Sequence, residues 1–429
     1  MEIFLQKVES LVWSFPLVIV LMTTHIFFTF YLKCPQKYTK KGFEIIFKKN
    51  KIVKEKKGIS SFSSLMTILA ATLGVGNIIG VASAITIGGI GSIFWIFVSG
   101  VFAIATKYAE TYLVLKYRKK DKNGYYGGAM YVLKEKLGFR KLAILFSIFV
   151  VLAAFGGSMI QSNSMVQTMS KTFNINIEIL AIITTIFCAY VIFGNEKRIA
   201  RVSSVLVPIS CIVYGFMCIA LAYLFRYNLV NSIVLIVKDA INFRAVAGGI
   251  FASLAIKAMN VGLSKGLFSN EAGMGSSPIF NATVEGDNTK NESIVASTSV
   301  FIDTVILCVI TGVLMVASGV WRAEKNPISL TIIVFGMIKN GNFFLTFCIG
   351  IFAIATIPCL GYYLSIAIKF LSNSNNNIKI FFEIVYIFCI YIGCVMSTKS
   401  VWAIASIANA FMVIPNLIMV YKLRSKIKK

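Results

Sequence analysis

The stretch LFSNEAGMGSSPIF, residues 267–280, decides how this chain folds. It lies inside a hydrophobic segment at residues 245–284 that is too long for one straight membrane crossing of ~20 residues. The stretch holds an amide, three serines, two glycines and the acidic Glu271. A charged side chain in hydrocarbon costs ~2.5 kcal/mol or more on insertion scales, and such residues face a partner or a cavity. The stretch therefore predicts an interrupted helix that lines a cavity.

A second interrupted helix is predicted at ATLGVGNIIGVA, residues 71–82, where three glycines and an asparagine lie at mid-depth. Small residues also serve close helix packing, and for this stretch alone packing is an equally good interpretation. Unwound backbone at membrane depth is tolerated only around a protein-lined or water-lined cavity. Each half-helix would offer free N–H groups to an anionic group, and free carbonyls would suit a cation.

The whole chain has the composition of a polytopic helical membrane protein. Of its 429 residues, 57% are hydrophobic and 14% are charged. A soluble core could not bury so many long hydrophobic runs, and about eleven of them reach the length of a helical crossing. They cover approximately residues 11–32, 60–87, 92–115, 142–161, 178–194, 202–225, 245–284, 295–320, 343–370, 379–397 and 401–421.

The distribution of Lys and Arg predicts the orientation of the chain. The formal net charge of +25 does not indicate a nucleic-acid partner, because the basic residues lie in loops between hydrophobic runs. Most of them, including residues 33–57 and the tail YKLRSKIKK at 421–429, fall on one side if the N-terminus is outside. Cytoplasmic loops carry such an excess. We therefore expect a protein integral to the plasma (inner) membrane, with the C-terminus cytoplasmic and the lipid bilayer as its surroundings. We expect no obligate protein partner.

The two interrupted helices begin two sets of five segments, one starting from the cytoplasm and one from outside. Paired, glycine-interrupted helices in inverted repeats indicate the binding site of a secondary transporter. The predicted organisation assigns residues 1–59 to an extra N-terminal transmembrane helix and a basic cytoplasmic loop, 60–228 to the first five-helix repeat, 229–421 to the second, inverted repeat, and 422–429 to a basic cytoplasmic tail.

Motifs of soluble enzymes are missing from the sequence. It has no Walker loop, no GxSxG and no HExxH, and its nine cysteines show no CxxC spacing. The GxGxxG pattern of dinucleotide sites needs a preceding strand, whereas LGVGNIIG lies inside a predicted membrane helix. We therefore expect no enzyme activity and no cofactor.

Eight motifs, in one order along residues 60–420, resemble the alanine or glycine:cation symporter family, the sodium:alanine symporters. SNEAGMGS and KYAE are the most specific of these signals. The resemblance implies an all-α fold of the LeuT type, with inverted five-helix repeats after one extra helix. It also implies sodium-driven uptake of a small neutral amino acid. The motifs are GVGNIIGVASAITIGGIG, ATKYAETYLVLKYR, YGGAMYVL, QSNSMVQ, RIARVSSVLVP, KGLFSNEAGMGSSPI, FIDTVILC and SGVW.

The resemblance implies that the substrate site lies between the two interruptions. The carboxylate of a zwitterion needs N–H donors, and its ammonium needs acceptors such as the carbonyl of Ser269 or the side chain of Gln161. A pocket walled by Phe268 and Met274 would select small side chains, although one methylene is worth only ~1–3 kcal/mol. The substrate-binding residues implied in this way are Val75, Gly76, Asn77, Gln161, Asn163, Phe268, Ser269, Asn270, Glu271, Gly273, Met274 and Gly275.

The resemblance also implies sodium as the coupling ion. The implied ligands are backbone carbonyls at the first interruption and one hydroxyl of the ninth segment, namely Leu73, Gly74, Gly76 and Thr356. Three positions depart from the family, because Val75, Ala355 and Val309 stand where members carry hydroxyl residues. Sodium prefers hard oxygen ligands, so these departures weaken the prediction for the ion more than that for the substrate.

Three functional hypotheses follow. Sodium-coupled symport of alanine, glycine or a similar amino acid comes first. Proton-coupled symport on the same fold, with Glu271 or Asp303 carrying the proton, is the alternative. A non-transporting, amino-acid-binding membrane protein is the third, and the absence of gradient-driven flux would identify it.

Other charged residues within the hydrophobic segments have predicted partners as well. Lys107 and Glu110 are three apart on one helix face, which predicts an ion pair or a snorkelling lysine or, alternatively, a cytoplasmic gate contact. Asp303 is expected to bind Lys107 or an N–H group of an interruption rather than an ion. Lys265 is expected to pair with an acid or to cap an extracellular gate. His25 is expected to be a packed residue.

Overall fold

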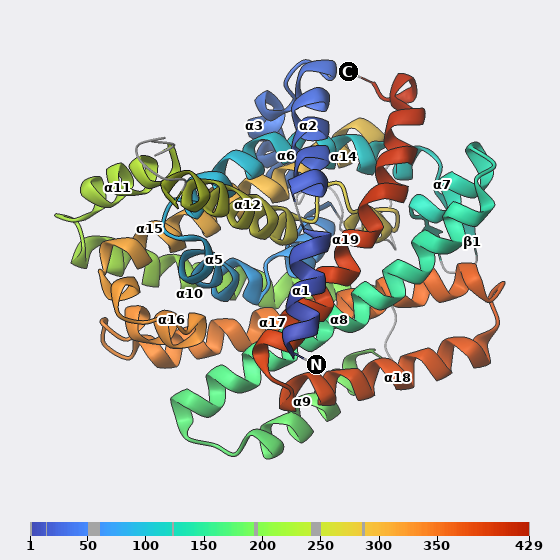
Figure 1. Ribbon diagram of the computed structural model, residues 1–429. Helices are drawn as coiled ribbons and strands as arrows, with labels where there is room; N and C mark the ends of the chain where they lie inside the picture. The colour runs from blue at the N-terminus through green and yellow to red at the C-terminus, as the bar shows by residue number, and fades with distance from the viewer. Residues whose placement is uncertain are drawn as a thin grey trace.

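The computed structural model describes residues 2–13, 15–49, 61–121, 124–192, 196–241, 250–284 and 288–428, and nearly all of them are helical (Figure 1). The predicted all-α fold is confirmed, with one short β-hairpin added. The first half contains α1 (Glu2–Val12), α2 (Phe15–Tyr31), η1 (Pro35–Tyr38), α3 (Thr39–Lys49), α4 (Ser61–Thr72), η2 (Val75–Asn77), α5 (Ile79–Gly88), α6 (Ser92–Lys116), β1 (Lys119–Asp121), β2 (Gly124–Tyr126), α7 (Ala129–Lys136), α8 (Arg140–Phe173), α9 (Ile177–Ile192) and α10 (Glu196–Leu224).

The second half contains both the second interruption and a π-helical segment, η3. Its elements are α11 (Leu229–Ile241), α12 (Ile250–Asn270), α13 (Ser277–Asn281), α14 (Thr289–Val300), η3 (Phe301–Cys308), α15 (Val309–Ala317), η4 (Val320–Arg322), α16 (Pro327–Phe335), α17 (Gly341–Leu371), α18 (Asn376–Val395), α19 (Thr398–Lys422) and η5 (Arg424–Lys426). Several helices begin at a side-chain cap, where an Asn or Ser oxygen accepts an N–H of the first turn. These caps are Asn288, Asn326, Asn375 and Ser397.

Both predicted interruptions are present. The first one falls between α4 and α5, and the chain bends by 60° across it. The second falls between α12 and α13, over the SNEAGMGS motif. Pro278 lies in the first turn of α13, where its missing N–H breaks no helical hydrogen bond.

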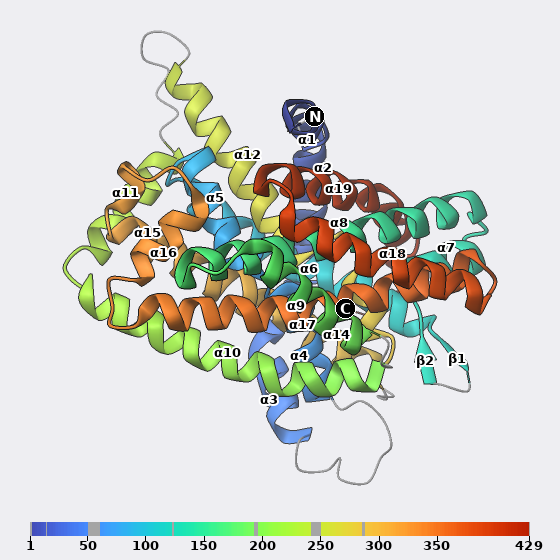
Figure 2. The ribbon, with the colours of Figure 1, turned by 90° about the horizontal axis from the view of Figure 1, so that it is seen from below.

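The helices form two groups that each take matching parts from both halves of the chain. In one group α6 packs against α12 and α14, and α5 packs against α12. In the other, α8 packs against α17 and α18, and α9 packs against α18 (Figure 2). Each predicted repeat thus gives its first two segments to one group and its next two to the other. This pairing is the contact pattern that two inverted repeats produce.

Seven helices of the described residues are long and apolar enough to cross a membrane, or nine if two bent pairs are each one span. The bent pairs are α1 with α2, and α4 with η2 and α5. Two further predicted segments correspond to α9, which has 16 residues, and to α12 with α13. All eleven predicted segments therefore coincide with helices, whereas eleven crossings remain a prediction.

The extra helix lies against the main body. α1 runs beside α19, and α2 runs beside α6 (Figure 1). The predicted repeat boundaries are still predictions. The boundary at 59/60 and the basic residues Lys51, Lys54, Lys56 and Lys57 lie outside the described residues.

Candidate functional site

The first interruption is held open by a side chain from α8. Gly74 takes an extended conformation before the 3₁₀ turn η2, and a Cβ at this position would collide with the Gln161 amide. The Val75 N–H donates to Gln161 Oε1 at 3.2 Å. Gln161 thus replaces a helical hydrogen bond that the interruption removes.

The second interruption is built from left-handed backbone. Glu271, Gly273 and Gly275 have φ values of 53°, 86° and 74°, a region that non-glycine residues rarely adopt. The Glu271 carboxylate accepts a hydrogen bond from the Ser276 hydroxyl at 2.6 Å. An acidic residue therefore occupies the strained end of α12 and is held there by the start of α13.

Helix α6 binds both sides of this second interruption through the KYAE motif. Lys107 Nζ donates to the Asn270 carbonyl at 2.8 Å. Glu110 Oε2 accepts from the N–H groups of Gly273 and Gly275 at 3.1 and 3.2 Å. The ammonium thus lies at the C-terminal end of α12, where the helix dipole favours a cation.

The Lys107–Glu110 ion pair is therefore a wrong prediction. Among the described residues the two side chains form no direct pair, although their i,i+3 spacing does place them on one face. Both charged side chains bind backbone groups of the interruption instead of each other. These carbonyl and N–H groups have no helical partners, and because they are buried they need other hydrogen-bond partners. We refer to Lys107, Glu110 and Asn416, whose amide donates to Glu110 Oε2 at 2.7 Å, as the α6 clasp.

Asp303 of the π-helical segment η3 connects the two interruptions. Its Oδ1 accepts hydrogen bonds from the Asn77 amide and from the Ser269 hydroxyl, the latter at 2.9 Å. Asp303 is fully buried, and its Oδ2 and the Oδ1 of Asn77 have no hydrogen-bond partner within the described parts of the chain. Of the two predicted partners, an N–H group of an interruption is bound, namely the side-chain amide of Asn77, whereas Lys107 donates to the Asn270 carbonyl instead.

A cavity of about 30 Å³ lies between the two interruptions. Phe268, Ser269 and Glu271 line it from the second interruption, and Gly76 lines it from the first. The other residues that line it are Ala71, Thr72, Ala153, Gly157, Ile160, Gln161, Thr356, Leu360 and Asn409. Six of the predicted site residues thus meet at one cavity: Gly76, Gln161, Phe268, Ser269, Glu271 and Thr356.

The other predicted substrate residues support the walls or lie elsewhere. Val75 and Met274 are completely buried without lining the cavity. Asn77 binds Asp303. Asn270 accepts a hydrogen bond from the Ala272 N–H through its own Oδ1. Gly273 and Gly275 contribute their N–H groups to the α6 clasp.

Asn163 requires a correction, because it does not face the cavity. Its amide donates to the carbonyls of Gly393 and Met396 at 2.8 and 2.9 Å, and its Oδ1 accepts from the Thr398 hydroxyl at 2.9 Å. Residues two apart on a helix point in nearly opposite directions, so Gln161 and Asn163 cannot share one target. Asn163 joins α8 to the turn between α18 and α19.

The predicted ion residues surround the first interruption. Leu73, Gly74 and Gly76 belong to it, and the Thr356 hydroxyl donates to the Ala70 carbonyl at 2.6 Å, one turn earlier. Ala355 is buried directly beside Thr356 and carries no hydroxyl. The Thr356 hydroxyl is thus a polar contact between α17 and the end of α4 that leads into this interruption.

Seven residues that line the cavity were not among the predicted site residues: Ala71, Thr72, Ala153, Gly157, Ile160, Leu360 and Asn409. Asn409 is an amide in the middle of the hydrophobic helix α19, and a polar residue at such a position indicates a cavity or a partner. That signal could have identified Asn409. No signal of this kind marks Leu360, because a leucine in a membrane helix is ordinary.

Comparisons with known proteins identify the family of this chain. The sodium:alanine symporter family model matches residues 1–429. An uncharacterised transporter of Haemophilus influenzae is 36% identical, over 99% of this chain and 94% of that protein. The sodium/alanine symporter AgcS of Methanococcus maripaludis is 34% identical, over 96% of this chain and 92% of that protein.

A solved structure identifies the fold. MhsT is a transporter with the LeuT fold. Its crystal structure in complex with L-phenylalanine matches this structure with a TM-score of 0.60 at 13% sequence identity. The match covers 86% of this chain and 90% of that chain. With its interrupted helices, its two helix groups and its family match, the chain therefore belongs to the sodium:alanine symporter family and is an integral membrane transporter of amino acids with the LeuT fold.

Proposed function

We propose that this transporter couples the uptake of a small neutral amino acid, such as alanine or glycine, to sodium. The cavity between the two interruptions carries the proposal, because it combines small size, polar groups of both kinds and enclosure by protein. The relative AgcS is named as a sodium/alanine symporter, which supports the same substrate and ion.

The size of the cavity favours a small substrate. One water molecule needs roughly 10–15 Å³ of space for its centre. The cavity offers about 30 Å³ of such space, which is enough for two to three groups the size of a water molecule. Ala153, Gly157 and Leu360 form an apolar wall that suits a hydrogen or methyl side chain. A larger side chain would have to displace Leu360 or the Phe268 ring.

The polar lining suits a zwitterion. Glu271, which lines the cavity, would supply a carboxylate acceptor for the substrate ammonium. The amide groups of Gln161 and Asn409 supply donors for the substrate carboxylate. Charged hydrogen bonds of this kind are roughly twice as strong as neutral ones, so they would fix the orientation of the substrate.

The balance of charges favours a cation near the interruptions. Three carboxylates, those of Glu110, Glu271 and Asp303, lie there, and Lys107 contributes one positive charge against them. Asp303 Oδ2 and Asn77 Oδ1 are buried and have no hydrogen-bond partner in the described part of the chain. Hard oxygen ligands of this type suit sodium. We infer that the coupling ion binds at Asp303, Asn77 and Ser269, while the site predicted at Leu73, Gly74, Gly76 and Thr356 is a second proposal.

Proton coupling is the second candidate function, and the burial of Asp303 is the observation that favours it. A carboxyl group enclosed in this way can be neutralised by a proton as well as by sodium. The departures at Val75, Ala355 and Val309 would then be tolerated, because a proton needs no ring of oxygen ligands.

Uptake of radiolabelled alanine into proteoliposomes tests the proposal. We expect uptake with an inward sodium gradient and its collapse when potassium replaces sodium on both sides. Glu271→Gln is expected to lower uptake at least tenfold, since it removes the acceptor charge for the ammonium, about 1.4 kcal/mol or more. Uptake that persists in potassium and follows a pH gradient would select the proton-coupled alternative. Binding of alanine without flux under either gradient would contradict both.

A further inference from the structure

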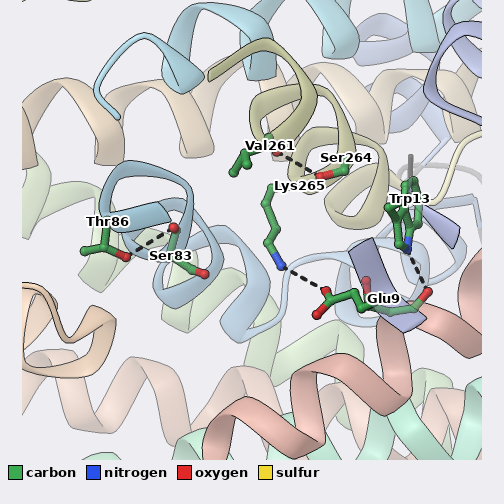
Figure 3. A network of polar contacts seen from close by, with 8 residues as sticks. Glu9, Trp13, Ser83, Thr86, Val261, Ser264 and Lys265 are labelled. Atoms are coloured by element: carbon green, nitrogen blue, oxygen red, sulfur yellow. Dashed lines mark hydrogen bonds and ion pairs between the residues drawn. The ribbon is translucent and has the colours of Figure 1, made fainter. Parts of the chain in front are cut away.

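A row of side chains leads from the cavity to helix α1, which lies outside both repeats. Phe268 lines the cavity, and its ring centroid is 5.7 Å from that of Trp402 on α19. Lys265, almost one turn before Phe268 on α12, has its Nζ 4.9 Å from the Trp402 ring centroid. The same Nζ lies 3.8 Å from Glu9 Oε1 on α1 (Figure 3). The row therefore joins the substrate cavity to the extra helix.

Exposure increases from Trp402 through Lys265 to Glu9. Trp402 is 8% exposed, the Lys265 side chain 13% and the Glu9 side chain 24%. The aromatic ring thus lies inside and the charged pair lies toward solvent. This order suits a closed gate. The aromatic ring can exclude water from the cavity, and the charged groups of Lys265 and Glu9 can remain hydrated.

The ring is enclosed by the half-helices of both interruptions. Gly80 of α5 lies so close that a Cβ there would be 3.2 Å from Trp402 Cη2. Lys265 reaches the ring from α12. Both half-helices lie on the side of the interruptions that holds the N-terminus, so the ring fills the space between them on that side.

Helix α1 holds Glu9 in place. The Trp13 indole, one turn after Glu9, donates to the Ser406 carbonyl of α19 at 2.9 Å and is buried. Glu9 therefore belongs to a fixed surface formed by α1 and α19. A movement of α12 away from this surface must separate Lys265 from both Glu9 and Trp402.

We propose that Glu9, Lys265 and Trp402 form a gate that closes the cavity toward the N-terminal side of the membrane. Lys265 is the positioning residue of this gate, since it holds the mobile half-helix to α1 and to the ring. The extra helix thereby gains a role in transport that neither repeat supplies. The gate rests on the proposed function in one respect, namely that the cavity is the substrate path.

Labelling of a cysteine placed beneath the gate tests this proposal. Ala153→Cys adds a thiol to the cavity wall, and a membrane-impermeant methanethiosulfonate reagent is applied to the side that carries an N-terminal epitope tag. We expect Lys265→Gln and Glu9→Gln each to raise the labelling rate roughly three- to tenfold, as expected when a partly buried ion pair no longer favours the closed state. The parent protein with its native cysteines gives the background rate.

Two further variants separate gating from folding. Lys265→Arg keeps the charge and the contact with the ring, so its labelling rate should match that of the Ala153→Cys protein with an unaltered gate. The exchanged pair Glu9→Lys with Lys265→Glu should restore slow labelling, which a merely destabilised protein would not do. Unchanged labelling in both single variants, or fast labelling in the exchanged pair, would overturn the gate. The assay needs neither alanine nor sodium, so it can fail independently of the proposed function.

Discussion

Asp303 shows how one residue can tie two distant parts of a chain together. Its carboxylate binds Asn77 of the first interruption and Ser269 of the second, which are 192 residues apart in sequence (269 minus 77). The second carboxylate oxygen of Asp303 is buried and has no hydrogen-bond partner among the residues that the structure describes. A cation bound there would draw the two half-helices together, and its affinity would rise with that of the substrate.

Asp303→Asn tests this role. The amide keeps the shape and one acceptor but loses the charge, so we expect sodium-dependent uptake to fall about 100-fold, the effect of losing ~3 kcal/mol of buried charge interaction. The thermal shift caused by sodium should disappear as well. Glu178→Gln, at an exposed position on α9, is the matched control and should change neither. A sodium-induced shift that survives in Asp303→Asn would place the ion elsewhere.

The role of Asp303 could be predicted only in part. A lone acid in a hydrophobic segment indicated a partner at an interruption, and that much was correct in general terms. The π-helical register of residues 301–308 is not visible in a pattern that assumes 3.6 residues per turn. The prediction that Asn163 faces the cavity was wrong for a simpler reason. Residues two apart on a helix point in nearly opposite directions, so Asn163 could not share a target with Gln161.

At the scale of elements, the second interruption depends on contacts from a neighbouring helix, α6. The α6 clasp binds one carbonyl and two N–H groups of residues 270–275. The position of the interruption could be predicted from its glycines and its acid. The clasp could not, because a helical i,i+3 pair is the more common explanation for Lys107 and Glu110.

Gly275→Ala should disturb this element severely. The residue has φ of 74°, and a Cβ would lie 2.7 Å from the Asn416 side-chain carbon Cγ, part of the clasp. We expect a loss of about 1–3 kcal/mol in the free energy of unfolding and little remaining uptake. Gly215→Ala is the control, because nothing lies within 4 Å of a Cβ there; it should be neutral or stabilising by up to ~1 kcal/mol. Equal melting temperatures for the two variants would contradict the strained geometry.

At the scale of the whole molecule, the chain divides into two helix groups that meet at the cavity. The group of α5, α6, α12 and α14 carries both interruptions, and the group of α8, α9, α17 and α18 carries Gln161 and Thr356. Movement of one group against the other would expose the cavity to each side in turn. Inverted repeats were predictable from two spaced interruptions, whereas the hairpin and the attachment of α1 were not, because neither has a periodic signal.

The predicted topology can be tested with tags at both ends. Eleven crossings place the termini on opposite sides, and the basic loops place the N-terminus outside. The cells are treated so that an antibody reaches the plasma (inner) membrane while that membrane stays intact. We expect the antibody to bind an N-terminal tag in these cells, and to bind a C-terminal tag only after lysis. Access to both tags, or to neither, would mean an even number of crossings and would contradict the count of eleven.

The α6 clasp has a consequence for how this family can diverge. Lys107 and Glu110 hold the interruption through main-chain atoms of Asn270, Gly273 and Gly275, so these contacts do not depend on the side chains of those residues. Glu271 belongs to both the interruption and the cavity wall, whereas Ala153 and Leu360 line the cavity from outside the interruption. Substitutions of such outer wall residues can therefore alter the preferred cargo while the interruption is inherited unchanged, which allows natural selection to change one and preserve the other.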